Sequence, residues 1–302
     1  MEYRGKIIKL IEDEGITKCL FDILEQSDSH KYIRELDESF DILEKIFPES
    51  IPMKQVGRCD YHVVDTWTHS VNALEELEKI MSNDQYFEIH LKDAYKVHMN
   101  EKIEGHHTRM QLLKLAVLFH DVGKPESRWI DEHGKVRFRG HEIVGAAMAE
   151  KIAERLELKN KEKEYFIKMV REHMWPLGLY KKNDVSGKTL FDLFKRLKED
   201  TLDLFLLGLA DIIATRILLN PDEEMRMYKI HIEYIVNNYL TRFKESADLV
   251  EAIDKRDIKN RFNIRKKQLN KIIENAKEAI FEGMIPPQEE AVIRYIELNR
   301  RL

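Results

Sequence analysis

The sequence is poor in the residues that interrupt helices. Its 302 residues include 12 glycines and 7 prolines, about half of the average usage of these two residues together. Leu, Ile, Glu and Lys dominate instead, and all four are compatible with helices. The scarcity of chain breakers therefore predicts a mostly helical protein with short connections.

Cysteine is almost absent, and long apolar runs are missing altogether. The two cysteines, Cys19 and Cys59, cannot build a disulfide framework or a four-thiolate metal site. No apolar run reaches 18 residues, which excludes a transmembrane helix, and the first residues lack the apolar stretch of a signal peptide. We therefore expect a cytoplasmic protein in a reducing compartment, without membrane contact.

The charge balance does not indicate a particular class of binding partner. Lys and Arg number 50 against 55 Asp and Glu, which leaves a net charge of −5. This mild acidity shows no overall preference for nucleic acid or anionic membranes. Hydrophobic residues make up 43% of the chain and charged residues 35%, a composition that supports a packed core and excludes disorder as the main state.

Apolar residues recur every three or four positions along most of the chain, which predicts an all-α fold. Residues 110–119 are apolar on nearly every face and predict a buried central helix, and 123–140 reads as a loop with a short β excursion at 136–138. We divide the chain into a neck-like helical segment (1–57), a central domain (58–220) and a C-terminal helical extension (221–302). The other helices are expected within 7–47, 65–81, 142–156, 161–172, 190–197, 202–219, 222–250 and 272–302.

Four side chains that can bind a metal lie in or beside these apolar helices. His120 and Asp121 follow the central helix directly, Asp211 lies inside helix 202–219, and His69 lies on helix 65–81. Burying imidazoles and carboxylates costs several kcal/mol unless something pairs with them, and a cation is a usual partner. Mixed imidazole and carboxylate ligands suit Mn, Fe, Co, Ni, Zn or Mg.

Three more residues extend this set, each with an ordinary structural alternative. His141 and His173 are expected at helix ends, where side chains can converge on a cavity but where histidine also interacts with the helix dipole. Lys124 could neutralise charge on a phosphate or be a solvated loop residue. A single buried His or Asp is often simply hydrogen-bonded within the core, so the hypothesis depends on the whole set.

The set resembles the H…HD…D signature of the HD superfamily of metal-dependent phosphohydrolases. More extended matches resemble the HD-containing region of bacterial CCA-adding tRNA nucleotidyltransferases and poly(A) polymerases. Residues 20–53 resemble the helical neck of that family, and 269–296 resemble its C-terminal helices. The matching segments are YHVVDTWTHS (61–70), LFHDVGKPES (118–127), FRGHEIVGA (138–146), VREHMWP (170–176) and LADIIATR (209–216).

The resemblance implies roles for the individual residues. His69, His120, Asp121 and Asp211 would hold a divalent metal, and His141 and His173 would bind a second metal or the substrate phosphate. Asp121 would also orient the attacking hydroxide, with Lys124 beside the phosphate. One or two ions would be bound.

One departure from that family decides the expected reaction. The polymerising head of these enzymes needs an Asp-x-Asp pair to hold two Mg²⁺ ions, and this sequence contains no Asp-x-Asp. Nucleotide addition by this chain alone is therefore not expected. We expect a phosphohydrolase that acts on a phosphomonoester or a 2′,3′-cyclic phosphodiester of a nucleotide or an RNA end.

A non-catalytic RNA-binding module is the alternative, possibly working with a nucleotidyltransferase head on another chain. Residues 255–271 contain eight Lys or Arg and one acidic residue, a density that could contact a tRNA backbone. The same stretch could also be a solvated helical face. Steep salt dependence of tRNA binding would distinguish the two.

Overall fold

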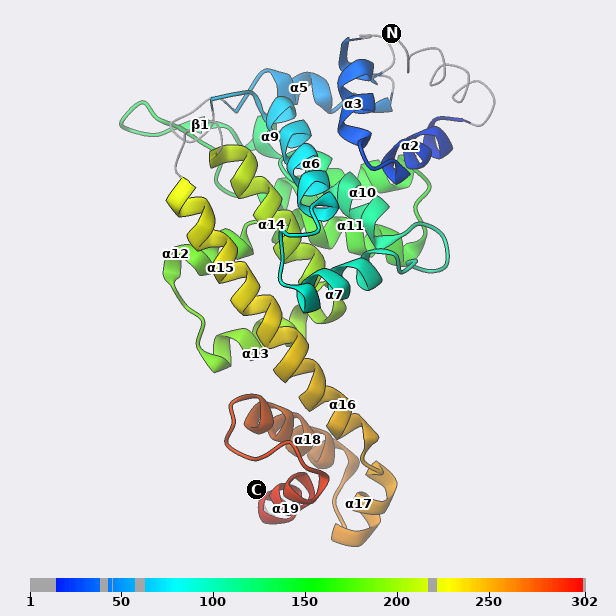
Figure 1. Ribbon diagram of the computed structural model, residues 1–302, viewed down its shortest axis with the longest axis vertical. Helices are drawn as coiled ribbons and strands as arrows, with labels where there is room; N and C mark the ends of the chain where they lie inside the picture. The colour runs from blue at the N-terminus through cyan, green and yellow to red at the C-terminus, as the bar shows by residue number, and fades with distance from the viewer. Residues whose placement is uncertain (1–14, 39–42, 45, 58–62, 217–221, 301–302) are drawn as a thin grey trace. The chain divides into compact units, whose positions relative to one another are not determined.

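The computed structural model describes residues 15–38, 43–44, 46–57, 63–216 and 222–300. Within these ranges the regular structure is helical apart from one two-stranded hairpin (Figure 1), so the predicted all-α class is confirmed. No helix in them combines the length and apolar content needed to cross a bilayer. Cys59 and parts of the predicted helices, residues 7–14, 39–42, 45, 217–219 and 301–302, fall outside the described residues.

The chain divides into two compact units, each described here by itself. Unit 1 comprises Met1–Lys181 and Leu202–Ile232, and unit 2 comprises Lys182–Thr201 and Glu233–Leu302. The three-part division predicted from the sequence stays a prediction. In unit 1 the elements are α2 (Ile16–Glu25), α3 (Ser29–Glu38), α5 (Ser50–Lys54), α6 (Thr66–Ser82), α7 (Ile89–Met99), α8 (Arg109–Phe119), α9 (Lys124–Ser127), β1 (Trp129–Ile130), β2 (Val136–Arg137), α10 (His141–Arg155), α11 (Asn160–Glu172), α12 (Trp175–Lys182), most of α14 (Thr201–Arg216) and the larger part of α15 (Asp222–Asn238).

Helix α8 forms the centre of unit 1. A capping box between Thr108 and Gln111 fixes its start, because each side chain bonds the other's backbone N–H. The helix packs against α6 and α11, and α6, α10, α11 and α14 gather in this part of the molecule (Figure 1). The rings of Trp67, Phe119 and Phe166 are completely buried around it. The prediction of a buried central helix is confirmed.

A turn at residues 120–123 follows α8, and Gly123 allows it to pack closely against α10. A Cβ atom on Gly123 would lie 2.2 Å from the carbonyl oxygen of His141 and 2.4 Å from the backbone nitrogen of Gly145. Only glycine allows two backbones to approach so closely. This contact holds the turn after α8 against the first turn of α10.

A short antiparallel hairpin then leads into α10. Trp129 pairs with Arg137 and Ile130 with Val136, which confirms the predicted β excursion. Gly140 caps α10 with a left-handed φ of 79°, a conformation that glycine adopts at little cost. The hairpin and the cap together fix the position of His141, the first residue of α10.

The predicted helices 65–81, 142–156 and 161–172 match α6, α10 and α11 within two residues at each end. The helices α5, α7, α9, α12 and α17 lie outside the predicted ranges. Helix α7 buries only Leu91, Tyr95 and Met99, so its apolar stripe is narrow among charged residues. The predicted long helix 222–250 is interrupted by a π-helical turn.

Unit 2 has an apolar core of its own. It contains α13 (Gly187–Leu197), the 3₁₀ turn η1 (Lys198–Asp200), the end of α15 (Asp222–Asn238), the π turn η2 (Tyr239–Phe243), α16 (Lys244–Ala252), α17 (Lys255–Phe262), α18 (Lys266–Phe281) and α19 (Glu289–Asn299). Helices α16, α18 and α19 pack on one another. Val250, Ile258, Ala276 and Val292 are buried in their shared core.

Candidate metal centre

Asp121 lies at the centre of a buried cluster of histidines. It directly follows His120, and its side chain is 3% exposed. Its Oδ2 lies 3.2 Å from Nε2 of His120 and 3.8 Å from Nε2 of His69. Its Oδ1 lies 3.2 Å from Nε2 of His141 and 3.6 Å from Nε2 of His173. The two oxygens of one carboxylate therefore face two different pairs of imidazoles.

A second carboxylate reaches the first pair from α14. Oδ1 of Asp211 lies 2.9 Å from Nε2 of His69 and 3.7 Å from Nε2 of His120. Asp211 is the more accessible carboxylate, with 15% of its side chain exposed. Two helices far apart in the sequence, α6 and α14, thus bring oxygen and nitrogen donors together with the end of α8.

Three of the imidazole rings are held in one orientation. Nδ1 of His120, His141 and His173 lies 2.8, 2.7 and 2.7 Å from the carbonyl oxygen three residues earlier in the chain. Because a carbonyl oxygen only accepts hydrogen bonds, each Nδ1 carries the hydrogen. Nε2, the nitrogen that faces Asp121, is then the atom available to bind a cation.

The donor atoms form two groups that share Asp121. His69, His120 and Asp121 offer ligand atoms within 4.8 Å of one another, and so do Asp121, His141 and His173. Nε2 of His120 is buried and makes no well-oriented hydrogen bond among the described residues, although Oδ2 of Asp121 lies 3.2 Å away. A buried polar atom without such a bond is costly, and a cation at this position would be its partner.

The charges in the cluster are strongly coupled. Burial alone would raise the pKa of Asp121, but the charges of Lys124 and His120 outweigh it and hold that pKa well below its usual range. Burial would lower the pKa of His120, but Asp121 and Asp211 raise it to about 9. Burial lowers the pKa of His173. Ionised carboxylates beside a neutral imidazole are the environment that a divalent cation prefers.

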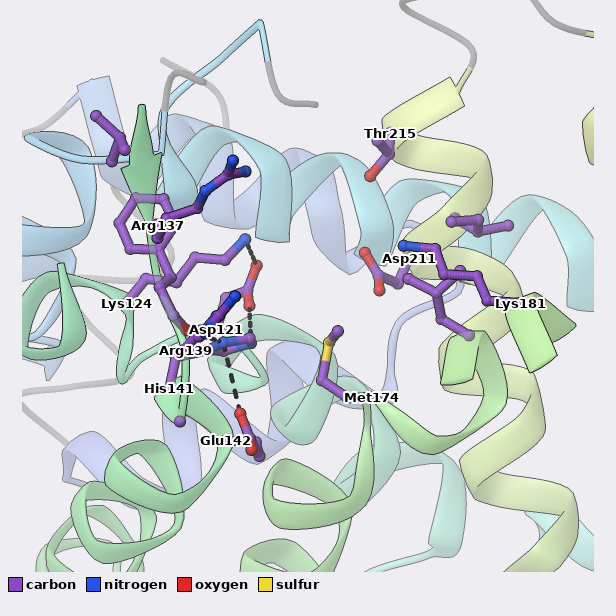
Figure 2. Close-up of a pocket in the computed structure, with 15 residues that line it drawn as sticks. Asp121, Lys124, Arg137, Arg139, His141, Glu142, Met174, Lys181, Asp211 and Thr215 are labelled. Atoms are coloured by element: carbon purple, nitrogen blue, oxygen red, sulfur yellow. Dashed lines mark hydrogen bonds and ion pairs between the residues drawn. The ribbon is translucent and has the colours of Figure 1, made fainter. Parts of the chain in front are cut away.

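The cluster opens into a cavity of about 520 Å³. Figure 2 shows Asp121, Lys124 and His141 on one side of it, and Asp211 with Lys181 on the other. A volume of this size suits a ligand such as a nucleotide. A ligand in the cavity can therefore reach both carboxylates.

Lys124 is buried beside the central carboxylate. Its Nζ lies 2.5 Å from Oδ2 of Asp121, and 6% of its side chain is exposed. The alternative of a solvated loop lysine is therefore wrong, since a buried lysine keeps its charge only when a partner stabilises it. Lys124 contributes a fixed positive charge at the edge of the cavity.

Comparison with known proteins assigns the family. Residues 61–216 match the HD domain, more than half of the chain. This chain belongs to the HD domain family. HD domains belong to a superfamily of metal-dependent phosphohydrolases and bind divalent metals, which agrees with the donor set around Asp121.

Two kinds of HD-containing protein are among its relatives. The CC-adding tRNA nucleotidyltransferase of Thermus thermophilus is 39% identical over 104 residues, which is 34% of this chain and 23% of that protein. The bifunctional uridylyltransferase/uridylyl-removing enzyme of Pseudomonas putida (strain F1) is 26% identical over 190 residues, 62% of this chain and 19% of that enzyme. The chain thus spans about a fifth of the length of these relatives. The predicted relation to tRNA nucleotidyltransferases is confirmed.

The structure brings all seven residues singled out in the sequence to one place in the HD domain. The helices and the turn after α8 carry them from distant parts of the chain, and their individual roles stay predictions. The seven are His69, His120, Asp121, Lys124, His141, His173 and Asp211. The side chain of Arg216, in the last of the matched segments, lies outside the described residues.

Three basic residues of the cavity were not predicted. Arg137 and Arg139 reach it from the hairpin, and Lys181 reaches it from α12. In the sequence they stand among other charged residues, without a spacing that separates them from ordinary surface positions. Only Arg139 carries a signal, since it lies in the matched segment 138–146 two residues before His141.

Proposed function

We propose that this HD domain protein is a metal-dependent phosphohydrolase that cleaves a phosphomonoester or a 2′,3′-cyclic phosphodiester of a nucleotide or an RNA end. The observation that carries the proposal is the arrangement around Asp121. Its two oxygens face separate histidine pairs, and the cavity beside them is lined by Lys124, Arg137, Arg139 and Lys181. Ligands for divalent cations and for phosphate thus share one cavity.

The residues fit the divalent metal that the family binds. Nε2 of His120 makes no well-oriented hydrogen bond among the described residues, and both donor groups contain only nitrogen and oxygen atoms. His69, His120, Asp121 and Asp211 would hold one ion, chosen among Mn, Fe, Ni, Co, Mg and Zn. When bound, such an ion lowers the pKa of water and polarises a phosphoryl oxygen.

His141 and His173 would either hold a second ion with Asp121 or bind the substrate phosphate. Their Nε2 atoms lie 3.1 Å apart and face Oδ1 of Asp121. The metal-to-protein ratio of purified protein, measured by elemental analysis, separates these roles. A ratio near two supports a second ion, and a ratio near one supports phosphate binding.

The charged side chains of the cavity would act on the phosphate. Asp121 would orient the attacking water by accepting a hydrogen bond from it. Lys124 would stabilise the negative charge that develops on the phosphoryl oxygens. Arg137, Arg139 and Lys181 would bind phosphate oxygens, which arginine contacts with two parallel N–H groups.

Hydrolysis assays test the proposal directly. We expect turnover of a 2′,3′-cyclic nucleotide, a 2′-nucleotide or p-nitrophenyl phosphate with Mn²⁺, Ni²⁺ or Mg²⁺, and loss of it in His120→Ala. His133→Ala is the matched control, because His133 is an exposed residue of the hairpin turn. Absence of turnover with every metal, or an unchanged rate in His120→Ala, would contradict the proposal.

RNA binding through unit 2 is the second candidate function. The eight basic residues of 255–271 are all exposed, and none pairs with a carboxylate of the described residues. They lie on α17 and on the first turns of α18. Such a surface suits a phosphate backbone. We would titrate tRNA at two salt concentrations, and weak salt dependence would contradict this function.

A further inference from the structure

The hairpin beside the cavity carries an exposed aromatic ring that phosphate hydrolysis does not require. Trp129 of β1 is 43% exposed. The guanidinium carbon of Arg139, which lines the cavity, lies 5.9 Å from the centre of the Trp129 ring. Arg139 thus connects the cavity to the indole, and it forms no ion pair with a described carboxylate. The ring and the guanidinium together form an aromatic and cationic surface at the cavity edge.

The hairpin holds this surface in place through its own turn. Asp131 accepts hydrogen bonds from the backbone N–H groups of His133 and Lys135 at 3.0 and 2.9 Å. It also accepts one from Nε of Arg137 at 2.8 Å. Arg137 is directly opposite Trp129 in the strand pairing. The cations and the ring are therefore positioned before any ligand arrives.

Cationic side chains and an aromatic ring extend from the cluster around Asp121 to the exposed hairpin. Lys124 contacts Asp121, Arg137 and Arg139 line the cavity beyond it, and Trp129 lies next to Arg139. Single-stranded nucleic acids present phosphates and unstacked bases in alternation. Proteins bind them with basic grooves and exposed aromatic rings.

We propose that Trp129, Arg137 and Arg139 bind the body of a short single-stranded oligonucleotide whose terminal phosphate ester lies at Asp121. Arg137 and Arg139 would contact a phosphate internal to the oligonucleotide, and a base would stack on Trp129. The inference rests on the proposed function, because the ester at Asp121 is the one to be hydrolysed. It makes an oligonucleotide end, and not a free mononucleotide, the preferred substrate.

Binding tests the inference without any turnover. The anisotropy of a fluorescein-labelled pentaribonucleotide is titrated with the full chain in the presence of EDTA. We expect Trp129→Ala to weaken binding about tenfold, since stacking one base contributes about 1–3 kcal/mol and about 1.4 kcal/mol is tenfold. Trp129→Phe should restore most of the affinity, because phenylalanine also stacks on a base.

Ile130→Ala is the matched control for the hairpin. Ile130 is exposed and adjacent to Trp129, and its side chain points to the other face of the strand. We expect it to bind the pentanucleotide like the wild type. Equal weakening in Ile130→Ala and Trp129→Ala would overturn the inference, since it would show a general defect of the hairpin. Unchanged affinity in Trp129→Ala would also overturn it.

Kinetics separate this inference from the proposed function. For Trp129→Ala we expect kcat/KM to fall about tenfold with a 3′-phosphorylated pentanucleotide, mainly through KM, and to stay unchanged with p-nitrophenyl phosphate. If the wild type hydrolyses p-nitrophenyl phosphate but Trp129→Ala affects neither substrate, the inference is wrong and the proposed function stands. If the wild type hydrolyses nothing while Trp129→Ala still weakens binding, the proposed function fails and the binding surface stands.

Discussion

Unit 1 contains two buried aspartates with opposite surroundings. Asp203 is completely buried, and protein donors saturate its carboxylate. The hydroxyl of Tyr165 donates at 2.7 Å, Nε2 of His98 at 2.6 Å and a guanidinium N–H of Arg109 at 3.0 Å. Asp121 instead contacts Nζ of Lys124 at 2.5 Å and faces four imidazoles at 3.2–3.8 Å. A buried aspartate thus belongs to a closed hydrogen-bond network in one place and to an open cluster of imidazoles in the other.

The difference separates a structural network from a ligand site. A closed network of hydrogen bonds stabilises the fold and leaves no donor or acceptor for a ligand. In the open cluster, Nε2 of His120 is buried and makes no well-oriented hydrogen bond among the described residues. Both aspartates are buried, so burial alone does not distinguish the two networks; the groups around each carboxylate and their distances do. The following variants test this contrast, from the largest expected effect to the smallest.

Asp121→Asn should abolish activity and spare the fold. The amide keeps the size of the side chain but removes the charge that both donor groups share. We expect kcat/KM to fall by about 10³-fold or more, because the loss of several kcal/mol of metal binding is involved, and the metal content to fall with it. Assays and elemental analysis measure both, and thermal melting checks the fold. Retained activity with full metal content would contradict the role of Asp121.

Asp203→Ala should destabilise the fold and leave metal binding unchanged. Removing one member of a buried charge pair costs about 3–5 kcal/mol, and His98 and Arg109 both donate to this carboxylate. Urea denaturation measures the loss. Metal content per folded chain should not change. Asp93→Ala on α7 is the control, an exposed position where we expect a change within about 0.5 kcal/mol. If Asp203→Ala lost no more stability than Asp93→Ala, the closed network would not be stabilising the fold.

Lys124→Met tests the fixed charge at the edge of the open cluster. The methionine keeps the apolar stem and removes the ammonium group that lies 2.5 Å from Asp121. We expect kcat to fall by about 10²–10³-fold, the usual loss when one charge-stabilising donor is removed. Lys135→Met, in the exposed hairpin turn, is the control in the same assay. An unaffected kcat in Lys124→Met would exclude contact between Lys124 and the reacting phosphate.

Gly123→Ala tests the turn that brings His141 to Asp121. The added Cβ would lie 2.2 Å from a backbone oxygen, and overpacking of this kind costs about 1–3 kcal/mol. We expect a lower melting temperature and a weaker metal affinity. Gly178→Ala in α12 is the matched control, because a Cβ there meets nothing within 4 Å and alanine stabilises a helix by about 0.5–1 kcal/mol. Equal melting temperatures in the two variants would contradict the prediction.

The closed network also predicts a pH dependence. Burial raises the pKa of Asp203, but the hydrogen bond from His98 and the charge of Arg109 outweigh it and lower that pKa below its ordinary value. Its stabilisation is therefore complete above the unfolded pKa of about 3.9 and is lost as the pH falls through the lower folded pKa. Asp203→Asn should melt below the wild type at neutral pH, and the gap should narrow below about pH 4. A constant gap would contradict the prediction.

The sequence singles out the residues that cluster around Asp121 because their positions violate a strong rule. His120, Asp121 and Asp211 are polar residues attached to the most apolar helices, where their burial demands an explanation. Asp203 lies in the same helix as Asp211, yet the sequence does not show that Tyr165 and His98 saturate it. That distinction depends on which side chains converge in space.

The basic side of the cavity could not be predicted for a different reason. Arg137 and Lys181 look like ordinary surface residues, since periodicity carries no information about charged residues in loops and short helices. Helix α7 escaped prediction because only one narrow stripe of it is buried. The π turn at Tyr239–Phe243 adds one residue to a helical turn, which a spacing of three and four cannot show.

Three imidazoles of the cluster are held by backbone carbonyl groups three residues earlier in the chain. This determines which sequence changes would preserve the cluster. The anchors belong to the backbone of Val117, Phe138 and Val170, so the side chains at these positions do not set the ring orientation. Substitutions there that preserve packing leave each ring in place. Inserting or deleting one residue between anchor and histidine would rotate the ring away from Asp121, although every ligand would still be present in the chain.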